Sequence, residues 1–156
     1  MKKTILLFVV LIASLTIYGQ DRVFSVEELT RFGLSMQQLD SIYKNSLPAS
    51  DSINPLFDQG YFDTVVEPAR LLLLQQAGGY LSKNDFRWGE PVKLWNRIYV
   101  NADGSIDYFV YHLMSPIDPK QELELKKQLN AFLKGEKLPV KSTKKWSLCG
   151  GVVWKD

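Results

Sequence analysis

The sequence predicts an α+β domain, a small two-layer sandwich with the element order α-β-β-α-β. The central observation is an antiparallel hairpin at residues 94–114, where two runs rich in β-branched and aromatic residues flank Asn101-Ala-Asp-Gly-Ser105. An Asp-Gly pair supplies the positive φ angle that a tight hairpin connection needs. A leucine-rich segment precedes the hairpin, and an amphipathic segment and a third strand-like run follow it. This order indicates helices packed on a sheet.

Both faces of the predicted hairpin are apolar. In its first strand, Ile98 and Val100 lie on one face and Trp95 and Tyr99 on the other, and the second strand repeats this two-sided pattern. Strands that are apolar on both faces belong to sheets covered on both sides. We therefore expect cover on both faces of the hairpin, at least in part.

The leucine-rich segment at residues 68–77 predicts the first helix. Pro68 suits its first turn, and Gly78 suits the left-handed position just past its end. The second helix begins after Asp118, which has the side chain of an N-cap, with Pro119 in the first helical position.

Trp146–Trp154 is the predicted closing strand. Two adjacent glycines, Gly150 and Gly151, interrupt its apolar side chains. Glycine inside a strand marks a bulge or a close approach of another group to the backbone.

Residues 1–19 have the features of a signal peptide. Lys2 and Lys3 form a basic start, residues 4–18 carry no charge, and the small residue Gly19 precedes Gln20. The apolar stretch is shorter than the roughly 20 residues that span a membrane. We expect cleavage between Gly19 and Gln20 and a periplasmic or secreted protein; the alternative is a leader retained as an anchor.

The mature chain divides into two parts. Residues 20–60 predict a helical N-terminal extension and loop, with capping patterns that start at Ser25 and at Ser35. Residues 61–156 predict the α+β core domain. Without Lys2 and Lys3 the 19 basic residues become 17, equal to the 17 acidic ones, which argues against a nucleic-acid partner. No stable membrane span is expected after signal cleavage.

Residues 68–154 resemble the C-terminal domain of TonB-type energy transducers. The shared features are a Pro-led first helix, a strand, the turn at residues 101–105, a second strand, an acid-capped second helix and a last strand. The resemblance implies this fold and the binding of peptides by strand addition at a sheet edge. An envelope adaptor with a protein or peptide partner in the cell envelope is the function that it implies here.

Catalytic and metal-binding patterns are weak. His112 is the only histidine and Cys149 the only cysteine, so a thiol nucleophile and its base would have to use this pair. A calcium loop at residues 101–107 lacks the acids that an EF-hand has at its first and twelfth positions, and turn chemistry explains its Asn, Asp and Ser residues. We expect no metal, no cofactor and no enzymatic activity.

The predicted binding surface is the closing strand, with Lys144, Lys145, Trp146 and Trp154. Its backbone would pair with a peptide, and the lysines beside it would contact an acidic partner. The alternative is a glycan or small-ligand module that uses exposed aromatic residues, chiefly Trp88 and Trp95. A small hydrolase is the third hypothesis.

Overall fold

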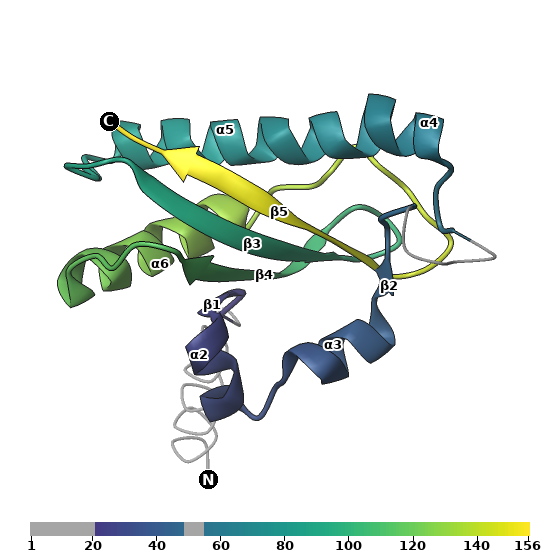
Figure 1. The fold of residues 1–156 in the computed structure, drawn as a ribbon, viewed down its shortest axis with the longest axis horizontal. Coiled ribbons are helices and arrows are strands. Elements are labelled where there is room, and N and C mark those ends of the chain that lie inside the picture. Colours follow the sequence, from purple (N-terminus) through teal and green to yellow (C-terminus); the bar gives the residue numbers. More distant parts are fainter. Residues whose placement is uncertain (1–20, 49–54) are drawn as a thin grey trace, which may run out of the picture.

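The computed structural model describes residues 21–48 and 55–156 as a five-stranded sheet with helices on both faces (Figure 1). The predicted α+β class and the order α-β-β-α-β of the core are confirmed. The predicted signal peptide and its junction at Gly19 and Gln20 lie outside the described residues. The elements are β1 (Val23–Ser25), α2 (Val26–Leu29), the 3₁₀ turn η1 (Thr30–Phe32), α3 (Met36–Ile42), β2 (Lys44–Asn45), α4 (Gln59–Tyr61), the π-helical turn η2 (Phe62–Val66), α5 (Glu67–Lys83), β3 (Val92–Val100), β4 (Ile106–Leu113), α6 (Pro119–Leu133) and β5 (Trp146–Trp154).

Strand β3 lies at the centre of the sheet, whose order is β1-β4-β3-β5-β2. It is antiparallel to β4, its hairpin partner, and to β5. The two short N-terminal strands lie at the outside, with β1 parallel to β4 and β2 parallel to β5. The N-terminal region, for which only helices and a loop were expected, therefore also supplies both outer strands.

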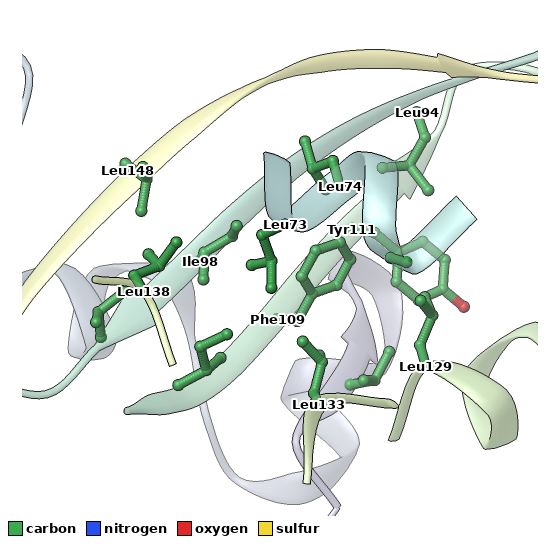
Figure 2. Close-up of a cluster of buried hydrophobic side chains, with 14 of the residues drawn as sticks. Leu73, Leu74, Leu94, Ile98, Phe109, Tyr111, Leu129, Leu133, Leu138 and Leu148 are labelled. Atoms are coloured by element: carbon green, nitrogen blue, oxygen red, sulfur yellow. The ribbon is translucent and has the colours of Figure 1, made fainter. Parts of the chain in front are cut away.

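Helices α5 and α6 cover one face of the sheet and bury the main core (Figure 2). The core on this face is built from apolar side chains, and burying a leucine or phenylalanine contributes ~2 kcal/mol each relative to leaving it exposed. The residues labelled in Figure 2 are Leu73, Leu74, Leu94, Ile98, Phe109, Tyr111, Leu129, Leu133, Leu138 and Leu148. The sheet and this helical layer together form the two-layer sandwich that the sequence predicts.

The N-terminal helices cover part of the opposite face, so the expected two-sided cover is confirmed. A second cluster joins Leu29 and Leu39 of this region to Tyr99 and Val110 of the sheet. Asp40 on α3 fixes the contact, because its carboxylate accepts a hydrogen bond from the Tyr99 hydroxyl at 3.0 Å. The sheet is thus held between two apolar layers.

Helix α5 is longer than the sequence predicts. It continues through Gly78 and Gly79 to Lys83 instead of ending at Gly78. The reason is packing: a Cβ at Gly78 would lie 3.3 Å from the indole Nε1 of Trp154, and Leu81, one turn further, is buried. Close contact with β5, and not helix termination, explains this glycine.

None of the helices in the described part of the chain is long and apolar enough to cross a membrane.

The hairpin turn requires glycine at position 104. Gly104 has a φ of +87°, and an added Cβ would lie 2.3 Å from the carbonyl oxygen of Leu138. We expect Gly104→Ala to lower the free energy of unfolding by ~2 kcal/mol or more, because it adds backbone strain to a steric clash.

Gly79→Ala is the matched control. This glycine is helical and exposed, and within the described ranges of the chain no neighbouring atom lies within 4 Å of an added Cβ. The control should raise stability by about 0.5–1 kcal/mol. Urea denaturation of both variants measures the difference, and equal effects would contradict this account of the turn.

Candidate functional site

Strand β5 is paired fully on one side and only at its start on the other. On one side all nine of its residues pair with β3. On the other, β2 pairs only with Trp146 and Ser147. The backbone amides of Lys44 and Ser46 donate to the carbonyl oxygens of Lys145 and Ser147 at 3.0 and 2.9 Å.

The remaining edge of β5 carries outward-facing backbone groups. Within a strand the N–H and C=O of one residue point to the same side, and the side alternates along the chain. Since the Ser147 carbonyl points towards β2, those of Cys149, Gly151 and Val153 point outward as well, and the even-numbered residues between them face β3. On this outward side, no strand or backbone group among residues 21–48 and 55–156 pairs with these three residues. We call Cys149, Gly151 and Val153 the open edge.

A shallow apolar hollow adjoins the open edge on the outer sheet face, the face that carries the N-terminal helices further along. Its volume is about 260 Å³, and its lining comes from β3, β5 and the end of β4. Two of its side chains are unusually exposed for apolar residues, Met114 at 63% and Val153 at 55%. The lining residues are Lys93, Leu94, Met114, Gly151, Val152 and Val153.

On the inner face, helix α5 supports β5 (Figure 1). The Arg70 guanidinium lies beneath Gly150, with Cζ 2.8 Å from the position of an added Cβ. Its Nε and Nη2 donate to the Glu67 carboxylate at 2.8 and 2.6 Å, and Arg70 is only 3% exposed. The close approach of another group to the backbone, one of the two options predicted for the glycines, is therefore found at Gly150.

The structure buries three of the four tryptophans. Trp146 is 0% exposed, Trp154 6% and Trp88 8%. The Trp154 indole donates to the Leu74 carbonyl oxygen at 3.3 Å and lies 5.5 Å from the Trp88 ring. These rings are core side chains and offer no stacking surface. Only Trp95, on the outer face, keeps a partly exposed side chain.

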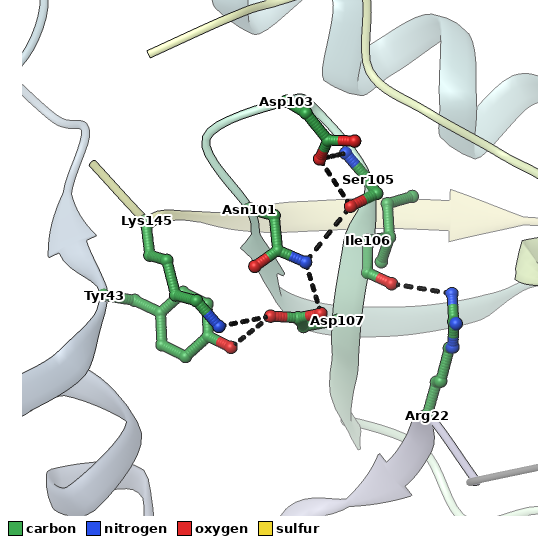
Figure 3. Close-up of polar contacts among 8 residues, drawn as sticks. All are labelled: Arg22, Tyr43, Asn101, Asp103, Ser105, Ile106, Asp107 and Lys145. Carbon is green, nitrogen blue, oxygen red and sulfur yellow. Dashed lines mark hydrogen bonds and ion pairs between the residues drawn. The ribbon is translucent and has the colours of Figure 1, made fainter. Parts of the chain in front are cut away.

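The two candidate lysines differ in role. Lys145 Nζ lies 3.1 Å from the Asp107 carboxylate and 5.2 Å from the centre of the Tyr43 ring (Figure 3). The Tyr43 hydroxyl donates to the same carboxylate at 2.5 Å. Burial, and next the hydrogen bond to Asp107, raise the pKa of Tyr43 far above its usual value, so the phenol stays a donor. Both lysines are exposed, but Lys145 links the N-terminal region to the hairpin, whereas the Lys144 ammonium makes no ion pair with the described residues.

The carboxylates of the hairpin turn are bound by neighbouring side chains. Asp103 accepts from the backbone amide and hydroxyl of Ser105 and pairs with Lys137 at 2.7 Å. Lys137 and then Ser105 lower the pKa of Asp103. Asn101 Nδ2 donates to Asp107 at 2.5 Å (Figure 3). Turn and ion-pair chemistry therefore account for the residues that suggested a calcium loop.

Cys149 and His112 do not form a nucleophile–base pair. Cys149 lies opposite Arg97, and His112 lies opposite Trp95 on the other side of β3. Two strand spacings separate their backbones by roughly 10 Å. His112 Nδ1 is instead 3.0 Å from the Glu27 carboxylate. The two residues are therefore too far apart to act as the nucleophile and base of the hydrolase hypothesis.

The sequence analysis assigned the candidate surface to the whole strand Trp146–Trp154, and the structure shows that β2 already pairs with its first two residues. β2 occupies the edge beside Lys144 and Lys145, and a two-residue strand has no pattern that would predict it. The signal that could have located the open edge is Gly151, an exposed glycine with no close neighbour.

No known family of sequences matches the chain, and no similar protein is found among curated proteins or solved structures.

Lys145→Gln should lower the free energy of unfolding by about 0.5–1 kcal/mol, because it removes an ion pair and a cation–π contact. It should also speed hydrogen exchange at the Ser46 amide, which bonds to β5. Lys144→Gln is the control and should change neither value. Hydrogen exchange and urea denaturation test both variants; equal effects would contradict the assigned role of Lys145.

Proposed function

We propose that this chain is an exported, non-enzymatic binding domain that takes up an extended segment of an envelope protein as an additional strand. The observation that carries the proposal is the open edge, where Cys149, Gly151 and Val153 present backbone N–H and C=O groups in the outward direction. In strand addition these groups supply the main-chain hydrogen bonds. Pockets for alternate side chains then supply specificity, and the hollow beside Gly151 is one such pocket.

The contrast with the opposite side of the sheet supports this choice of edge. There, the side-chain oxygen of Asn130 on α6 accepts from the backbone amides of Arg22 and Val23 at 2.8 and 3.2 Å. Exposed edges invite unwanted pairing, and proteins usually cover or shorten them. One edge of this sheet is capped in that way and the other is left open along three outward-facing residues.

Two features of the sequence support the envelope setting. The basic start and uncharged stretch of residues 1–19 are typical of an export signal. The TonB-like order of helices and strands is typical of a domain that binds peptides at a sheet edge. The proposed role is therefore that of an adaptor that acts after export, in the periplasm or outside the cell.

Glycan or small-ligand binding through exposed Trp and Tyr residues is the second hypothesis, and Trp95 is the one tryptophan that it retains. Stacking on a sugar needs an accessible aromatic ring. Because Trp88, Trp146 and Trp154 are buried, the outer face offers one partly exposed indole. Peptide binding is favoured since it uses the backbone of the edge itself.

Val153→Pro should lower partner binding at least about tenfold, ~1.4 kcal/mol, with little loss of stability. The change removes an outward N–H, so the β3–β5 hydrogen bonds remain. Proline at Val152 would be uninformative, because that N–H faces β3. The measurement is a crosslinked pull-down of C-terminally tagged protein from its own cell envelope, with mass spectrometry and a thermal melt.

Val153→Thr is the matched control, because it keeps both the N–H and the β-branched shape, and Lys120→Ala is a remote surface control. Both should recover the partner as the unchanged chain does. Undiminished recovery with Val153→Pro would overturn the proposal. The mass of the recovered chain also tests export, since cleavage should leave Gln20 at the N-terminus.

A further inference from the structure

We infer that the added strand carries an aromatic side chain opposite Gly151 and an acidic side chain beside Lys155. This inference rests on the proposed function, because it specifies the partner of the same edge. It follows from the different surroundings of the two glycines in β5 and from the charges at the end of the strand.

Gly150 and Gly151 have different surroundings. The space that a side chain at Gly150 would fill is taken by the Arg70 guanidinium from inside the molecule. At Gly151, on the outer face, no atom of the described residues lies within 4 Å of an added Cβ. A glycine inside a strand costs roughly 0.5–1 kcal/mol relative to alanine; Gly151 is paired with Trp95 of β3, but no side chain among the described residues fills the space of its missing Cβ.

A ring from a neighbouring strand is the group that fits this gap. On a sheet face, side chains directly opposite each other on adjacent strands are in contact, and an aromatic side chain can lie across a glycine on the next strand. Without a Cβ at Gly151, a ring from the added strand can cross β5 and enter the hollow. It would meet Val153 and Met114 there, both more than half exposed.

The charges around the hollow favour an acidic neighbour for that ring. Lys93 lies opposite Val153, and Lys155 continues the outward alternation of β5. Both lysines are exposed, and neither takes part in an ion pair among the described residues. If the added strand runs parallel to β5, as β2 does, a carboxylate two positions C-terminal of the ring lies on the same face, opposite Val153 and next to Lys155.

A second copy of this chain fits the edge less well. Antiparallel self-pairing centred on Gly151 would place glycine opposite glycine and leave the hollow empty. It would also bring Lys155 opposite Ser147 of the other copy, where β2 already pairs. A partner of different sequence can place a ring in the hollow and a carboxylate beside Lys155.

The test uses the full chain and three blocked seven-residue peptides. The first is polythreonine with valine second, phenylalanine fourth and glutamate sixth, so that these three share a face. The others replace phenylalanine by alanine or glutamate by glutamine. Binding is measured by titration, and exchange protection of the Cys149, Gly151 and Val153 amides reports the site.

The phenylalanine peptide should bind at least about tenfold tighter than the alanine peptide. Gly151→Val should remove this advantage while leaving the alanine peptide unaffected, and its open surroundings should keep the fold stable. Lys155→Gln should remove the preference for glutamate over glutamine, and Lys120→Gln should keep it.

The outcomes separate the two proposals. Equal affinity of the phenylalanine and alanine peptides for the unchanged chain, with protection at the open edge, would overturn the aromatic subsite and leave strand addition in place. This comparison needs no protein variant. If no peptide protects the open edge and Val153→Pro captures the envelope partner undiminished, strand addition fails too. A concentration-dependent dimer that protects the same amides would assign the edge to a second copy.

Discussion

The structure depends on one strand, β3, which is hydrogen-bonded along its length on both sides. Its pairing with β4 and β5 sets the register of the sheet, and the register decides which side chains face which layer. Ile98 therefore joins the core under α5 and α6, while its neighbour Tyr99 joins the N-terminal helices. The same alternation fixes the direction of every backbone group in β5, including those without a partner.

Two short N-terminal strands complete this sheet to different extents. β1 lies against α6, whose Asn130 accepts the amides next to it, whereas β2 reaches only the first two residues of β5. Buried backbone groups must find hydrogen-bond partners, but groups at an exposed edge can bond to water or to another chain. The proposed function therefore arises from where the N-terminal region stops covering the sheet.

Local patterns predicted the core elements well. The Asp-Gly turn, the capped α6 and the limits of β5 all follow from short-range chemistry at residues such as Gly104 and Asp118, whose carboxylate accepts the Lys120 amide at 2.8 Å. Features that depend on distant contacts could not be predicted. Gly78 continues α5 because it packs on Trp154, and β2 forms only because β5 offers its edge. The sequence could therefore indicate β5 as a strand, but not which part of its edge β2 would cover.

The most direct test is residue-resolved hydrogen exchange of β5 in the free protein. If the edge is open, the amides of Cys149, Gly151 and Val153 exchange rapidly and those of Leu148, Gly150 and Val152, which face β3, are protected. This alternation needs no partner and no variant. Uniform protection along residues 148–153 would show that the edge is already covered, and the account of this chain as a strand-accepting domain would be wrong.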